Sequence, residues 1–273
     1  MTGMASTEIP PASARRRLPA AFVAGAIVGV LGGMIGLGGA EFRLPLLIGV
    51  FGFVALQAVI LNKAMSLIVV ATALPARLFS LPISDLTPHW TVVLNLLGGS
   101  MLGAWAGATW ATRMRSATLY KVLALLLVFI AIALAASHFG EMRQVDLAPG
   151  AQVVAGLIAG FGIGMVAALM GVAGGELLIP TIVLFYGLDI KIAGSLSLAV
   201  SLPTMFVAFA RYSRDRSFDV LKHNGTFVLT MAAGSVVGTL IGGVLLGVVP
   251  NAVLVPLLVL LLVLSSIKVW RHA

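Results

Sequence analysis

Two glutamates are the residues of this chain whose type and setting most suggest chemistry. Glu41 and Glu176 each lie in a long apolar segment, directly after a run of small residues and four residues before a proline. Ionisable side chains are costly at membrane depth, where they commonly mark ion or proton pathways. We therefore treat both as candidates for coupling proton movement to that of a substrate. The alternative, which we weigh equally, is that each carboxylate caps the helix that follows it.

The small residues before each glutamate form a glycine-rich break. Glycine is costly inside a helix, whereas proline is favoured in the first turn of a new one. Each segment therefore predicts a helix, a non-helical break and a short second helix that starts near Pro45 or Pro180. Helix N-termini present unpaired N–H groups and a partial positive charge, so two of them meeting near the membrane midplane would bind an anion. The break residues that we expect to bind substrate are Gly38, Gly39, Ala40, Glu41, Gly174, Gly175 and Glu176.

Other glycines have a simpler interpretation. Gly103 and Gly107, like Gly238 and Gly242, are four residues apart in apolar segments. Such pairs let two membrane helices approach closely, and we assign them to packing. The break glycines could serve the same purpose, but the adjoining glutamate and proline favour a binding site there.

Polar side chains recur in the helix after each break. Asn62 and Ser66 lie one turn apart, as do Ser197 and Ser201. We expect all four to line the substrate path, with interhelical hydrogen bonding as the equally weighted alternative. Lys63 lies about 12 Å into its helix. It would either neutralise an anion, which we favour, or extend to the membrane surface. Further candidates for pairing with the anion are Arg43, Arg77 and Arg211.

These positions belong to a longer internal repeat. Residues 25–128 match residues 160–263 at a constant offset of 135 without a gap. Shared Gly, Pro, Ser and Glu carry the match, and these residues seldom coincide by chance in an apolar chain. We divide the chain into a tail at 1–18 that is expected to be poorly ordered, a first repeat at 19–138, a linker at 139–150 and a second repeat at 151–273. A duplicated membrane unit is typical of a transporter whose site lies between the halves.

Composition places the chain in a membrane. Of its 273 residues, 60% are hydrophobic and only 10% are charged, against about 25% charged in soluble domains. Several apolar windows exceed the roughly 18 residues needed for a spanning helix, so the predicted class is an all-α polytopic membrane protein. The net charge of +8 sits in short loops, which favours a topological role over nucleic-acid binding. The chain has no cysteine, and its four histidines have no metal-ligand spacing, so we expect no metal, no cofactor and no enzymatic activity.

Each repeat reads as a broken first segment plus three transmembrane helices. The segments are 20–52, 55–79, 90–111 and 117–138, then 152–187, 190–211, 225–248 and 252–270. If the broken segments turn back, the two repeats are inverted and nearly all loop cations share one side; if they cross fully, the repeats are parallel. The positive-inside rule favours inversion, with both termini in the cytoplasm. Trp90, Trp110 and Trp270 are expected at the membrane interfaces.

The doubled break, each copy followed by a proline and then by Gly52 or Gly187, resembles the sulfite exporter TauE/SafE family. The likeness extends over nearly all of residues 20–270. It implies a transporter of the bacterial inner membrane for sulfite, sulfonates or related small sulfur-containing anions, built from two inverted repeats. Ala40 and the stretch Asn62–Ala64 depart from the commoner pattern of that family, which leaves the substrate within it open.

The sequence therefore predicts a secondary transporter or exporter of small sulfur-containing anions that works by alternating access, with proton coupling through Glu41 or Glu176. Its expected partners are the small anion and the lipid bilayer, with no nucleic acid, while a homo-oligomer stays open. The alternatives are a passive anion channel and a transporter of a different small anion. Both would use the same residues.

Overall fold

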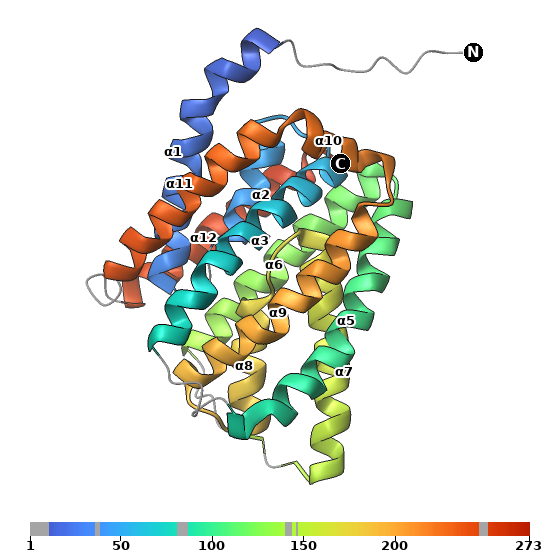
Figure 1. The fold of residues 1–273 in the computed structure, drawn as a ribbon, viewed down its shortest axis with the longest axis vertical. Coiled ribbons are helices and arrows are strands. Elements are labelled where there is room, and N and C mark those ends of the chain that lie inside the picture. Colours follow the sequence, from blue (N-terminus) through green and yellow to red (C-terminus); the bar gives the residue numbers. More distant parts are fainter. Residues whose placement is uncertain (1–10, 36–38, 81–86, 140–143, 146, 246–250) are drawn as a thin grey trace.

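The computed structural model describes residues 11–35, 39–80, 87–139, 144–145, 147–245 and 251–273, and these are helical with no strand among them (Figure 1). Seven of the described helices are long and apolar enough to cross a membrane. The first half consists of α1 (Pro11–Ile35), α2 (Ala40–Gly49), α3 (Ala55–Ser80), a 3-10 turn (Thr87–His89), α5 (Trp90–Arg113) and α6 (Ser116–Phe139). The second consists of α7 (Pro149–Met170), α8 (Gly175–Tyr186), α9 (Ile190–Tyr212), a 3-10 turn (Arg216–Phe218), α10 (Asp219–His223), α11 (Gly225–Val244) and α12 (Asn251–Trp270).

The predicted segments are confirmed to within a few residues, except at two places. Residues 11–18, which we assigned to a poorly ordered tail, form the start of α1. The short helices were expected to start near their prolines, but α2 starts at Ala40 and α8 at Gly175. Pro45 and Pro180 are therefore the sixth residue of each helix. Proline fits a helical φ but lacks an N–H, so the helix starts earlier and loses one backbone hydrogen bond at the proline.

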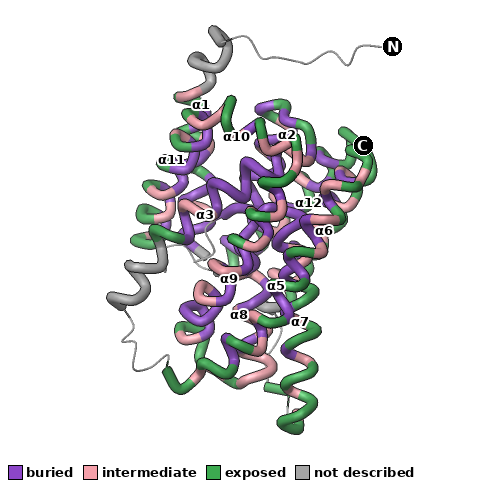
Figure 2. The backbone as a smooth tube through the Cα atoms, turned by 45° about the vertical axis from the view of Figure 1, so that its right-hand side comes forward, coloured by how far each residue is buried: buried purple, intermediate pink, exposed green. Residues whose placement is uncertain are grey.

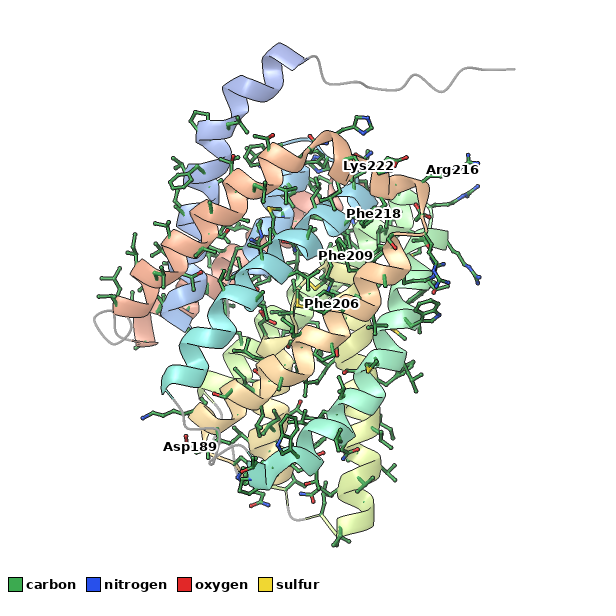
Figure 3. All side chains as sticks on the ribbon, viewed as in Figure 1. Asp189, Phe206, Phe209, Arg216, Phe218 and Lys222 are labelled. Carbon is green, nitrogen blue, oxygen red and sulfur yellow. The ribbon has the colours of Figure 1, made fainter. Side chains whose placement is uncertain are left out.

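Each broken segment turns back at its glycine break. Residues at the C-terminal end of α8 contact the chain just before α7 and the first turns of α7: Val145 N–H donates to the Leu184 carbonyl at 2.8 Å, and the Tyr186 hydroxyl lies against Gly156. Figure 1 shows α2 returning in the same way toward the end of the molecule where α1 enters. The start of α1 and the C-terminus lie toward that end, together with Arg216 and Lys222, whereas Asp189 lies near the other (Figure 3).

Glycine seams join the two halves. α1 runs along α11, and α5 runs along α7. A Cβ on Gly103 would overlap the Phe161 carbonyl, and one on Gly238 would overlap the Ala26 carbonyl. The packing assigned to these glycines is therefore confirmed, because any side chain would push the helices apart.

The helices of the bundle differ in how far their residues are buried (Figure 2). α3 passes through the interior, with 67% of its most apolar window buried, against 33% for the windows of α6 and α12. Exposed apolar side chains such as Leu102, Leu125, Ile158 and Val244 lie on the outside, where lipid would cover them. Polar side chains are buried instead around the two breaks, where α2, α3, α7 and α11 meet.

Candidate functional site

The C-terminal end of α7 is held by polar side chains of α3. The last carbonyl groups of a helix have no partner within it, so at membrane depth they must find one elsewhere. Asn62 Nδ2 donates to the Met170 carbonyl at 3.0 Å, and Ser66 Oγ donates to that of Gly171 at 3.1 Å. Lys63 Nζ donates to the carbonyl groups of Ala167 and Val172, at 2.8 and 2.6 Å.

Lys63 does not extend to the membrane surface. Its side chain is only 1% exposed, so that alternative is wrong. The favourable field at a helix C-terminus accounts for the position of the ammonium group. Two of its three protons go to backbone carbonyls, which leaves one donor for another group. Lys63 thus holds the end of α7 through hydrogen bonds to its backbone and also places a cation in the interior of the bundle.

Arg43 is the second buried cation. Its side chain has no solvent exposure, and its guanidinium donates to Asn62 Oδ1 at 2.9 Å, to Ser66 Oγ at 3.1 Å and to Ser235 Oγ at 3.1 Å. All three acceptors are neutral. A guanidinium has five N–H donors, so two of them have no acceptor among the described residues. Buried charges are ordinarily paired, and an unpaired guanidinium is suited to an incoming anion.

Glu41 and Glu176 lie close enough together to interact electrostatically. One carboxyl oxygen of Glu41 and both of Glu176 are buried without a hydrogen-bond partner in the described chain. The nearest described cations, Arg43 for Glu41 and Lys63 for Glu176, act on them through their charge but not through an ion pair. Each carboxyl group also lies near its own backbone N–H, but neither oxygen of Glu176 accepts a hydrogen bond among the described residues, so the helix-capping alternative is not supported there.

The two glutamates lie in the first turns of α2 and α8. The residues before these helices, Gly39 and Gly174, have φ values of 69° and 87°, which is left-handed backbone that glycine adopts without strain. In α2 the first backbone hydrogen bonds come from Phe42 and Arg43, both to the Gly39 carbonyl. The N–H groups before them are free of intrahelical partners, as at any helix start. The structure thus brings two helix N-termini, each with a carboxyl group, into one region.

The candidate residues of α9 have a weaker connection to this region. Ser197 Oγ donates to the Gly194 carbonyl of its own helix at 2.8 Å, and Ser201 Oγ is buried without a partner among the described residues. At the repeat offset, Arg43 and Lys63 correspond to Leu178 and Leu198, so both cations come from the first half. Gly38, another candidate, lies outside the described residues.

Some participants were not among the predicted site residues. Ser235 of α11 binds Arg43, and the buried Tyr212 hydroxyl donates to the Ala168 carbonyl at 2.9 Å. Ser100 Oγ and Thr204 Oγ1 are 2.7 Å apart and join α5 to α9. Ser100 and Ser235 occupy matching positions in the two repeats, and this match could have identified both serines from the sequence. Nothing in the sequence marks Tyr212.

Arg211 is not part of the cluster around the breaks. Arg211 Nε donates to Thr109 Oγ1 at 2.8 Å, and its guanidinium lies 5.8 Å from the ring centre of Trp105, at the end of α5. The side chain of Arg77 lies outside the described residues. We use the name central polar cluster for the buried set that surrounds the breaks, namely Glu41, Arg43, Asn62, Lys63, Ser66, Glu176 and Ser235.

Comparison with known proteins gives one match. The family model described as sulfite exporter TauE/SafE matches residues 21–269, which is almost the whole chain and includes every member of the central polar cluster. No curated protein and no solved structure matches the chain.

Proposed function

We propose that the central polar cluster is the anion-binding site of this chain, which belongs to the sulfite exporter TauE/SafE family. Membership of this family supports a membrane exporter of sulfite or a related sulfur-containing anion. The observation that carries this proposal is the pair of buried cations, Arg43 and Lys63, that keep unused donors beside two helix N-termini. Small oxyanions have several acceptor oxygens, so one anion can take donors from a guanidinium, an ammonium and backbone N–H groups together.

The two carboxyl groups set the conditions for binding. An anion that enters beside ionised Glu41 and Glu176 is repelled, whereas a protonated carboxyl group is neutral and can donate a hydrogen bond. Anion and proton binding therefore favour each other, and this coupling is reciprocal. We propose that the anion leaves the cell together with a proton that one of these groups carries.

We further propose that the two halves are inverted repeats that alternate access to the site. Gly39 and Gly174 are 135 positions apart and share left-handed backbone, and so do Gly52 and Gly187. The packing of α1 on α11 corresponds, under the same offset, to that of α7 on α5. Relative movement of two such halves about their shared glycine seams would open the site to one side at a time.

Flux measurements on proteoliposomes test the proposal. The panel is sulfite, sulfate, thiosulfate and sulfonates, each with and without a pH gradient. We expect a sulfur-containing anion to accumulate against its own gradient when a pH gradient is applied. Flux that only runs downhill and ignores the pH gradient would instead indicate a passive channel.

Substitutions separate the roles of the residues. We expect Glu41→Gln or Glu176→Gln to weaken the response to the pH gradient while the protein still binds anion. Removing donors to an anion costs about 1.5–3 kcal/mol, so Arg43→Gln should weaken anion binding about 10- to 150-fold, with exposed Arg216→Gln as its control. Full pH-dependent transport by both Gln variants would exclude the coupling role, and unchanged binding by a folded Arg43→Gln variant would exclude the anion site.

A further inference from the structure

A groove separates α6 from α12 on the outside of the bundle, away from the central polar cluster. It has a volume of about 350 Å³, and its walls come from the middle of α6 and from the last turns of α12 with the residue that follows them. The lining is apolar along Leu125, Val128 and Ile267, and it ends at Trp270 and Arg271. Its volume is in the range of pockets that hold an organic molecule.

Cations gather at one end of this groove only. Arg271 lines it, and Lys121 Nζ lies 5.9 Å from the ring centre of Trp270. Both cations are exposed, and neither has an ion-pair partner in the part of the chain that the structure describes. The other lysine of this region, Lys268, instead lies along Gly49 of α2. One end of the groove is therefore basic, whereas the rest of its lining is uncharged and mostly apolar.

The position of the groove matches the depth of a lipid. Trp270 is 47% exposed beside the last residues of α12, where amphipathic rings mark the level of the headgroups. Val128 lies seven residues beyond Lys121 on α6, which is about 10 Å farther into the hydrocarbon. Leu125 and Ile267 keep 61% and 48% of their surface exposed there, so each has room for an apolar occupant.

We propose that this groove binds one anionic phospholipid. Its phosphate pairs with Lys121 and Arg271, and an acyl chain lies against Leu125, Val128 and Ile267. Basic sites between membrane helices are suited to anionic headgroups. The electrostatic attraction of two cations near the surface favours binding of an anionic over a zwitterionic lipid by about 30-fold. This site is independent of the transported anion.

Native mass spectrometry of the full chain in detergent tests the proposal, with phosphatidylglycerol and phosphatidylcholine of the same chain length as probes. We expect one phosphatidylglycerol to bind about 30-fold more tightly than phosphatidylcholine. The double variant Lys121→Gln, Arg271→Gln should lose this preference. Its control, Arg113→Gln with Arg216→Gln, removes two exposed cations, one at the end of α5 and one in the second 3-10 turn, and should keep this preference.

Two further arms identify the occupant. Val128→Phe fills the body of the groove and leaves both cations, so we expect it to weaken binding of long-chain but not of short-chain phosphatidylglycerol. Excess inorganic phosphate should leave the lipid bound; complete displacement would mean that the cations hold a free anion, which would overturn the proposal. A wild-type dimer that Val128→Phe dissociates would also overturn it, because the groove would then be an interface between two copies.

Discussion

Replacement of Lys63 by methionine separates a structural role from a role in anion binding. Methionine is nearly as long and is apolar, so it fills the same space without donating a hydrogen bond. In the wild type, Lys63 Nζ donates to the carbonyl groups of Ala167 and Val172 at the end of α7. In the variant the Ala167 carbonyl still accepts from the Val172 N–H at 3.1 Å, whereas the Val172 carbonyl loses its partner.

The expected loss follows from these two bonds. The Ala167 carbonyl keeps its backbone partner, so one unsatisfied buried acceptor remains, that of Val172, and such an acceptor costs about 1–3 kcal/mol. Interhelical hydrogen bonds in membranes measure lower, and the variant no longer desolvates an ammonium group. We therefore expect Lys63→Met to lower the free energy of unfolding by about 1–2 kcal/mol, which is about 5- to 30-fold in the unfolding equilibrium.

Reversible unfolding in mixed micelles of mild detergent and sodium dodecyl sulfate measures this loss. The control is Lys191→Met, because that side chain is exposed at the start of α9 and should change stability by less than about 0.5 kcal/mol. A Lys63→Met variant that unfolds like the wild type would refute the reasoning that its ammonium group holds the end of α7. Loss of anion binding by a variant of unchanged stability would assign Lys63 to the anion alone.

Two further predictions concern packing and surface charge. Gly103→Ala should destabilise the protein by about 1–3 kcal/mol because its Cβ would overlap a carbonyl of α7, whereas Gly162→Ala, which meets nothing within 4 Å, should be neutral or slightly stabilising in the same unfolding assay. In the short helix α10, the hydrogen bond and charge of Lys222, 3.0 Å away, lower the pKa of Asp219. A carboxyl group whose pKa is lowered in the folded state stabilises that state at pH values above the unfolded pKa, and this contribution disappears as the pH falls. Lys222→Gln should therefore raise the pKa of Asp219 toward its ordinary value and make the free energy of unfolding less dependent on pH at acidic pH. Carbon-detected NMR titration of Asp219 would check the shift, and an unchanged pKa would contradict the pairing.

Much of the fold was predictable because it depends on local patterns. Long apolar runs specify spanning helices wherever lipid replaces water, and the predicted segments agree with α3, α5, α6, α9, α11 and α12. The exact starts of the short helices were not predictable. Proline at Pro45 is compatible with either the first turn or a position inside the helix, and the positive φ at Gly39 decides for the earlier start.

The sequence alone determined a membrane protein with two glycine breaks, each beside a glutamate, because glycine, proline and charge have strong local preferences in an apolar chain. Only the tertiary structure decided that the breaks turn back and that Glu41 approaches Glu176. It also decided that Lys63 holds the end of a helix from the other half, and that Arg43 binds serines 23 and 192 residues away. These are long-range contacts, and the hydrophobicity of a segment limits its depth in the membrane but not which neighbour it meets.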